Sequence, residues 1–217
     1  MNYEQARFNM IEQQIRPWEV LNLDVLDLLS VIKRENFVPE AYRNQAFADL
    51  DVPLPHGQHM LSPKIEARIL QELAVRKHEQ VLEIGTGSGY MAALLAARAQ
   101  RVLSVEVHED IAAFAQHNLI ANAVANVDVA VGDAARGWEA AAPYDVIVVS
   151  GGLPILPQAL LEQLKVGGRL SAFVGDAPVM KAQIVTRLSE TEFRIVEIFE
   201  TYVAPLEHAL QPPRFKF

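Results

Sequence analysis

Three glycines alternate with small polar residues directly after a short apolar run, and this turn is the segment best suited to bind a ligand. Residues 81–90 read Val-Leu-Glu-Ile-Gly-Thr-Gly-Ser-Gly-Tyr. A buried strand, a glycine turn and a helix start bring backbone N–H groups together at the carboxyl end of the strand, where ligands of parallel sheets bind. A tight turn alone does not require so many glycines, because glycine loses the most conformational entropy on folding. The spacing therefore predicts a ligand site.

The same turn favours one class of ligand over another. A dinucleotide-binding turn reads G-x-G-x-x-G, and the position of its third glycine holds Tyr90, whose bulk opposes the close approach of helix and strand. A nicotinamide-dependent dehydrogenase is therefore a weaker alternative. The spacing from Glu83 to Gly89 resembles the first motif of S-adenosylmethionine-dependent methyltransferases. That resemblance implies that the backbone of Gly85, Gly87 and Gly89 lies against the amino-acid part of the cofactor.

Two acidic residues follow the next predicted strands. Glu106 lies 17 residues beyond Gly89, and a carboxylate there can accept hydrogen bonds from both ribose hydroxyls. Asp133 follows the strand at 126–131, and the resemblance implies that it accepts from the adenine amino group. Alone, either residue could be an ordinary strand-end or turn acid. The predicted cofactor-binding residues are Glu83, Gly85, Thr86, Gly87, Ser88, Gly89, Glu106, Val107, Asp133, Ala134 and Ser150.

Short apolar strands alternate with helices in the part of the chain that carries these residues. Strands are expected near 80–84, 101–107, 126–131, 144–149 and 168–174, and helices near 88–98, 110–122 and 157–164. This alternation predicts a parallel, doubly wound α/β sheet with both faces covered. Two further runs, 181–188 and 193–199, are joined by a connection too short for a parallel crossover, which predicts a hairpin. Seven strands with the last antiparallel form a sheet similar to that of Rossmann-like methyltransferases.

The first third of the chain has helical periodicity. Helices are predicted over 4–15 and 24–34, the second with Asp24 as its N-cap, and another begins at Ser62-Pro63. We expect a single domain, with a helical N-terminal segment and substrate loop over 1–78 and a cofactor-binding core with the C-terminal hairpin over 79–217. The N-terminal segment would cover the cofactor and shape the acceptor site, or form a dimer surface instead.

Composition excludes several functions. The 217 residues carry 19 Lys and Arg against 27 Asp and Glu, giving a net charge of −8, which disfavours a general nucleic-acid binder. The chain has no cysteine, so disulfides and thiolate chemistry are ruled out. The start lacks the pattern of a secretory signal and no apolar run is long enough to cross a bilayer. A cytoplasmic protein without membrane partners is expected.

Over most of its length the chain resembles the protein-L-isoaspartate O-methyltransferase family. The matching stretches are Gly57-Gln58 with Pro63 after it, 81–90, 144–149 with Pro154 and Pro157 after it, 163–170 and 202–206. That family uses S-adenosylmethionine to esterify the carboxylate of isoaspartyl residues in damaged proteins. The resemblance implies a protein or peptide acceptor. No catalytic residue is assigned, because an ionised carboxylate attacks a sulfonium methyl group without a general base.

The loop before the helix at Ser62-Pro63 departs from this family. Family members usually read Gly-Gln-Thr-Ile-Ser there, with the serine hydroxyl facing the reacting centre, and this chain reads Gly57-Gln58-His59-Met60-Leu61. Losing a hydrogen bond to a charged group removes about 1.5–3 kcal/mol. We hypothesise a methyltransferase that keeps the cofactor site and has an altered acceptor pocket. The predicted substrate-binding residues are Gln58, His59, Leu61 and Ser62.

Two other interpretations stay open at this point. The chain could bind S-adenosylmethionine without isoaspartyl turnover, or methylate another small-molecule acceptor, and the sequence does not decide its oligomeric state. His56 and His59 lie three residues apart, but the loop offers no third ligand, so a solvent-facing pair is expected and no metal site is predicted.

Overall fold

A computed structural model describes residues 2–213 and contains a seven-stranded sheet in the order β5-β4-β3-β6-β7-β8-β9. Its strands are β3 (Gln80–Ile84), β4 (Arg101–Glu106), β5 (Val127–Val131), β6 (Tyr144–Leu153), β7 (Leu164–Val174), β8 (Met180–Arg187) and β9 (Phe193–Thr201). The first five are parallel, and β8 and β9 form an antiparallel hairpin at one edge. The predicted fold is confirmed. The strand that runs against the parallel five is β8, since β9 reverses direction again.

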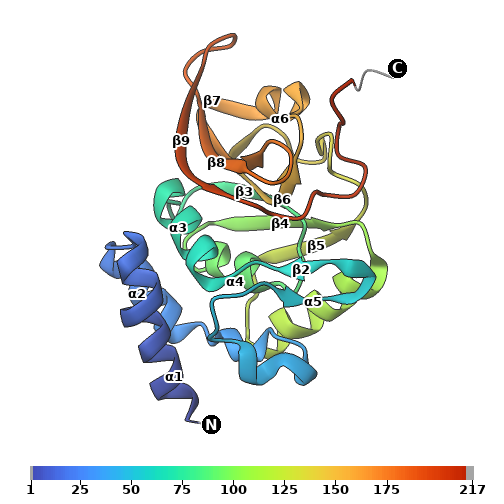
Figure 1. Cartoon of the computed structure of the whole chain (residues 1–217). Helices are drawn as coiled ribbons and strands as arrows, with labels where there is room; N and C mark the ends of the chain where they lie inside the picture. The colour runs from blue at the N-terminus through green and yellow to red at the C-terminus, as the bar shows by residue number, and fades with distance from the viewer. Residues whose placement is uncertain (1, 214–217) are drawn as a thin grey trace.

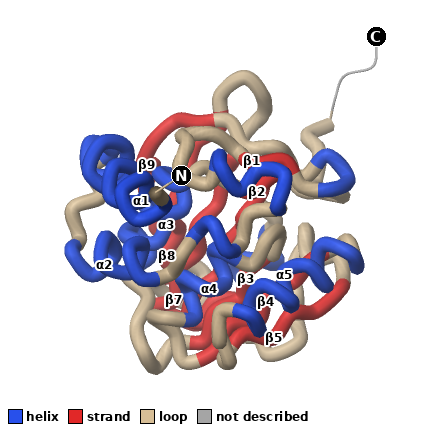
Figure 2. The backbone as a smooth tube through the Cα atoms, turned by 90° about the horizontal axis from the view of Figure 1, so that it is seen from below, coloured by secondary structure: helices blue, strands red, loops and turns tan. Residues whose placement is uncertain are grey.

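Helices cover the two faces of the sheet unequally. They are α1 (Tyr3–Met10), α2 (Leu23–Val31), α3 (Pro63–Leu73), α4 (Tyr90–Ala96), α5 (Glu109–Ala121) and α6 (Gln158–Glu162). The core on one face joins α1 to α5 with strand residues such as Val81, and the core on the other joins α6 with residues such as Leu82. Figures 1 and 2 show the N-terminal helices and α3 grouped on one side of the sheet. Within residues 2–213, no helix combines the length and apolar character that a bilayer span requires.

The N-terminal helices differ locally from the sequence prediction. The N-cap of α2 is Asn22, whose Oδ1 accepts hydrogen bonds from the backbone N–H groups of Asp24 and Val25. Asp24 lies instead in the first turn, where its charge favours the positive end of the helix. The helix predicted over 4–15 is present, but its second half, Ile11–Ile15, winds as a π-helix.

A small hairpin connects this helical segment to α3. Its strands, β1 (Val52–Pro53) and β2 (His59–Met60), pair antiparallel around a short 3-10 turn at Pro55–Gly57. Residues 51–61 are called the β1–β2 hairpin below. It ends at Ser62, which holds the N-cap position of α3 without a capping side-chain bond, while its backbone N–H donates to Asp51 Oδ1 at 2.8 Å. The hairpin places the predicted substrate loop beside the glycine turn.

Candidate functional site

A cavity of about 710 Å³ opens at the carboxyl ends of the parallel strands, between the glycine turn and the β1–β2 hairpin. The end of β4, the loop after β5 and the C-terminal segment around Leu206 complete its lining. Seven of the predicted cofactor-binding residues line this cavity, namely Gly85, Gly87, Glu106, Val107, Asp133, Ala134 and Ser150. The structure therefore gathers residues from four separate strand ends around one space.

The glycine turn uses its three glycines for two different purposes. Gly85 and Gly87 adopt φ values of +89° and +53°, which L side chains rarely take, and their backbone lines the cavity. Gly89 lines neither this cavity nor the smaller one described below. A Cβ on Gly89 would lie 3.2 Å from the carbonyl oxygen of Ala115, so this glycine allows α4 to pack closely on α5. Gly89 also has a positive φ, of +83°, and its predicted contact with the cofactor stays a prediction.

Glu106 ties the glycine turn to the end of β4. Its buried carboxylate accepts a hydrogen bond from Gly87 N at 3.0 Å through Oε2, and from Val107 N and His108 N through Oε1. A carboxylate offers about four lone-pair directions, and these three donors leave one open on the oxygen that faces Gly87. Glu106 can therefore both shape the turn and accept from a ligand hydroxyl, with less free capacity than the sequence alone suggests.

The lining of the large cavity is acidic. Asp133 Oδ1 accepts from Ala135 N at 3.0 Å, and its Oδ2 lies 3.0 Å from His208 Nδ1. Asp51, Glu106 and Glu207 also line the cavity, and none of the described lining residues is Lys or Arg. Such a lining disfavours a diphosphate and favours a ligand with positive charge and hydroxyl groups.

A smaller cavity of about 280 Å³ continues from the glycine turn beneath Met60 and Leu61. It is lined by the remaining predicted cofactor residues Glu83, Thr86 and Ser88, together with Ser150. The fully buried Glu83 accepts from Ser104 Oγ at 2.5 Å and from Ser150 Oγ at 3.4 Å. Burial raises the pKa of Glu83 to about 8, which favours the neutral carboxyl group near pH 7.

A buried arginine that the sequence analysis did not single out holds the β1–β2 hairpin in place. Arg34 is fully buried, donates from Nη2 to the Leu61 carbonyl at 2.6 Å and from Nε to the Ala46 carbonyl at 3.0 Å, and forms an ion pair with Glu66. Burial raises the pKa of Glu66 to about 7, although the Arg34 charge opposes the rise. No local pattern marks Arg34, because its partners lie 12 to 32 residues away.

Three of the four predicted substrate-binding residues line a cavity, and the fourth does not. His59 and the buried Leu61 line both cavities, and Gln58 lines the larger one, where its Nε2 donates to Glu207 Oε1 at 3.0 Å. Ser62 lines neither cavity. Ser62, the neighbour of Leu61, therefore forms no part of either cavity wall and stands at the start of α3.

The C-terminal segment completes the site, although the sequence predicts no role for its residues 202–206. Gly152 N donates to the Ala204 carbonyl and Leu206 N donates to the Gly152 carbonyl, both at 2.9 Å, so this segment crosses the end of β6. A Cβ on Gly151 would lie 2.5 Å from Leu206 Cδ2. This close approach brings Leu206 and Glu207 to the cavity.

Comparison with known proteins agrees with this arrangement. The family model described as protein-L-isoaspartate(D-aspartate) O-methyltransferase matches residues 5–210. A protein-L-isoaspartate O-methyltransferase of Syntrophus aciditrophicus is 41% identical over 188 residues, 87% of this chain and 86% of that protein. One of Methanoculleus marisnigri is 42% identical over 192 residues, 88% of this chain and 86% of that protein.

Solved structures share the fold. A Plasmodium falciparum structure described as a protein-L-isoaspartate O-methyltransferase, solved in complex with S-adenosyl-L-homocysteine, superposes with a TM-score of 0.81 at 17% identity, covering 95% of this chain and 99% of that one. A second structure, also named protein-L-isoaspartate O-methyltransferase, gives a TM-score of 0.81 at 24% identity, covering 94% of this chain and 67% of that one.

Proposed function

Because this chain belongs to the protein-L-isoaspartate(D-aspartate) O-methyltransferase family, we propose that it methylates the carboxylate of isoaspartyl residues in proteins and peptides. It is an S-adenosylmethionine-dependent methyltransferase. The observation that supports the acceptor best is the junction of the two cavities, where the glycine turn meets the β1–β2 hairpin that carries His59 and Leu61. Binding of NAD and turnover-free cofactor binding are not favoured.

The residues of the large cavity fit the cofactor. When bound, S-adenosylmethionine supplies a methyl group on a positively charged sulfur. We propose that the open oxygen of Glu106 accepts from the ribose, that Asp133 and the backbone at Ala134 face the base, and that the acidic lining matches the positive charge. Glu83 would face the cofactor's ammonium group, which would favour the ionised carboxylate and release a proton on binding.

The chain's own residues contribute mainly position. An ionised carboxylate is already a nucleophile, so methyl transfer requires an in-line arrangement and exclusion of water rather than a general base. The β1–β2 hairpin supplies that arrangement, since Arg34 fixes the Leu61 carbonyl and so sets the direction of the neighbouring side chains. The side chain of Leu61 contributes apolar surface at the junction and can make no hydrogen bond.

We propose that His59 takes over part of the contact with the acceptor carboxylate. His59 is exposed, lines both cavities and can donate a hydrogen bond from its ring, whereas the neighbouring Leu61 cannot. His59 on β2 lies two positions before Leu61, the position at which the family pattern has a serine. The acceptor would therefore be held by a differently placed donor than in most of the family.

The assignment is tested with two peptides that differ only at one residue. Purified protein with radiolabelled S-adenosylmethionine should form a base-labile methyl ester on a peptide containing isoaspartate and none on the peptide with normal aspartate. Equal labelling of both peptides, or of neither, would overturn the proposal. His59→Ala should raise the KM for the isoaspartyl peptide while leaving the affinity for S-adenosylhomocysteine unchanged.

The remaining expectations stay proposals. The division into an N-terminal segment over 1–78 and a core over 79–217 is supported by the position of the β1–β2 hairpin, which joins the two. A cytoplasmic location remains a prediction, and the acceptor is expected to be a protein or peptide rather than a nucleic acid, in keeping with the net charge of −8.

A further inference from the structure

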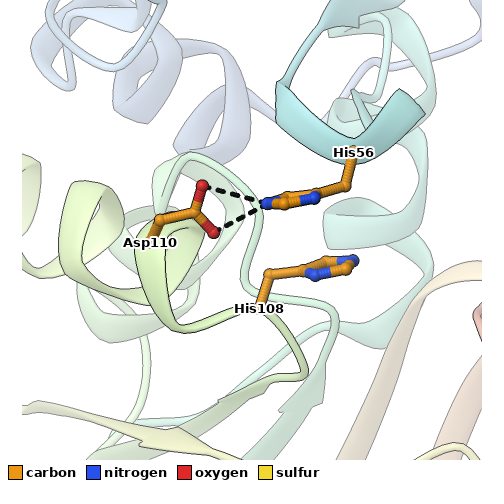
Figure 3. Close-up of side chains that lie close together, drawn as sticks. All are labelled: His56, His108 and Asp110. Atoms are coloured by element: carbon orange, nitrogen blue, oxygen red, sulfur yellow. Dashed lines mark hydrogen bonds and ion pairs between the residues drawn. The ribbon is translucent and has the colours of Figure 1, made fainter.

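Three side chains with metal-binding atoms meet at the rim of the large cavity. His56 lies on the turn of the β1–β2 hairpin, and His108 and Asp110 lie at the start of α5, more than fifty residues away in sequence. One ligand atom of each side chain lies within 4.8 Å of the other two. Figure 3 shows the His56 imidazole above that of His108, with the Asp110 carboxylate beside the His56 ring. We call these three residues the rim cluster.

The members of the rim cluster contact one another, and His108 also contacts Glu207 of the C-terminal segment. His56 Nε2 lies 3.0 Å from both oxygens of Asp110, and the two imidazole rings stack with centroids 4.1 Å apart. His108 Nε2 lies 2.8 Å from Glu207 Oε1, which also accepts from Gln58. His59, which the sequence analysis considered as the partner of His56, is not a member of the cluster.

This ligand set suits a divalent transition metal. Two imidazoles and one carboxylate are a common protein set for Zn²⁺ and related ions, with bonds of about 2.0–2.2 Å and a fourth position for water or another carboxylate. Tetrahedral bonds of that length place ligand atoms about 3.3 Å apart. The two rings are stacked at an interplanar angle of 7°, so their nitrogen lone pairs run parallel and one ring must turn before both can bind the same ion. The side chains of His56 and Asp110 are 45% and 60% exposed, which leaves them room to turn to that spacing. Glu207 could fill the fourth position.

We propose that His56, His108 and Asp110 bind a divalent transition metal ion such as Zn²⁺. The ion would join the β1–β2 hairpin to the start of α5, directly after the cavity residues Glu106 and Val107. A bound metal would thereby hold the hairpin against the cofactor cavity. Binding of the ion and of the cofactor would then favour one another, since coupling between sites is reciprocal.

Metal binding is measured first without cofactor, so that its failure is distinct from failure of the proposed methyl transfer. Metal-free protein should bind one equivalent of Zn²⁺ at micromolar concentrations in a calorimetric titration, and Co²⁺ should give the visible absorption of a low-coordinate site. His56→Gln, His108→Gln and Asp110→Asn should each weaken Zn²⁺ binding at least tenfold. His117→Gln, an exposed histidine on α5 outside the cluster, should bind Zn²⁺ as the wild type does.

Two results would overturn the proposal. One is the absence of Zn²⁺ binding by the wild type, which would leave the rim cluster as a stacked pair with an ion pair. The other is equal Zn²⁺ binding by the wild type and all three cluster variants. Thermal unfolding of each variant verifies that it is folded.

The coupling has a separate readout. Zn²⁺ should raise the affinity of the wild type for S-adenosylhomocysteine about fivefold or more and leave that of His56→Gln unchanged. If the wild type bound S-adenosylhomocysteine equally well with and without Zn²⁺, the metal would not hold the hairpin against the cofactor cavity.

Discussion

The glycine turn and the β1–β2 hairpin face the same cavities but are held by different kinds of interaction. The turn is held by the conformations of its own glycines and by one hydrogen bond, from Gly87 N to Glu106, which lies 19 residues further along the chain. The hairpin is fixed by a distant buried charge, Arg34, which binds the Leu61 carbonyl and Glu66. The turn thus depends on the identity of its glycines, whereas the hairpin depends on a backbone carbonyl and a buried ion pair.

This contrast bears on the departure from the family that the sequence predicts at Leu61. The carbonyl of residue 61, and not its side chain, makes the structural contact with Arg34. Under the proposed function, the buried side chain of Leu61 would face the acceptor, while the residues around the glycine turn would face the cofactor.

The largest expected effect is the loss of stability when Arg34, which holds the β1–β2 hairpin, is replaced. Arg34→Met should lower the free energy of unfolding by about 3–5 kcal/mol, because it leaves Glu66 buried without its partner. Urea denaturation measures the change. Arg101→Met, which removes an exposed ion pair with Asp128, should leave the midpoint unchanged. Similar midpoints for both variants would mean that Arg34 does not anchor the hairpin.

On the cofactor side, Glu106→Ala should lower the affinity for S-adenosylhomocysteine about ten- to a hundredfold, the value of one hydrogen bond to a charged group. It removes the acceptor for Gly87 N and the proposed ribose contact. Isothermal titration provides the measurement, with the exposed Glu109→Gln as the control. An unchanged affinity for S-adenosylhomocysteine would contradict the proposed contact between Glu106 and the ribose.

The buried Glu83 gives the fold a pH dependence. Its pKa is raised from 4.5 to about 8 in the folded protein. Protonated Glu83 therefore contributes to folding stability in full below pH 4.5, and this contribution decreases as the pH rises and is lost above about pH 8. The wild type should therefore lose about 4 kcal/mol of stability between pH 5 and 9 relative to Glu83→Gln. Urea unfolding across this range measures it. Parallel pH profiles of the two proteins would contradict the assignment.

The smallest expected effect is on the activity toward the acceptor, when Leu61 in the β1–β2 hairpin is replaced. Leu61→Ser should raise kcat/KM for an isoaspartyl peptide about tenfold, because a hydroxyl at the junction adds a hydrogen bond to a charged acceptor. The affinity for S-adenosylhomocysteine should stay the same. Leu54→Ser, a buried cavity residue near Gly87, should bring no such gain. A loss of activity in Leu61→Ser would show that the leucine itself fits the acceptor.

The sequence predicted the parts of the molecule that are governed by local chemistry. The five parallel strands, the terminal hairpin and the turn at Gly85 follow from apolar runs, connection lengths and glycine spacing. The role of Gly89 in packing α4 on α5 could not be predicted, since it depends on the neighbouring helix at Ala115. Arg34 and the rim cluster were missed for the same reason, because their partners are brought together only by the fold.

A structure of the complex with S-adenosylhomocysteine and an isoaspartyl peptide tests the division between the two regions most directly. The account predicts the ribose against Glu106, and the peptide carboxylate within hydrogen-bonding distance of His59 and beside Leu61. A peptide bound away from the β1–β2 hairpin, or a nucleoside outside the cavity of the glycine turn, would contradict it.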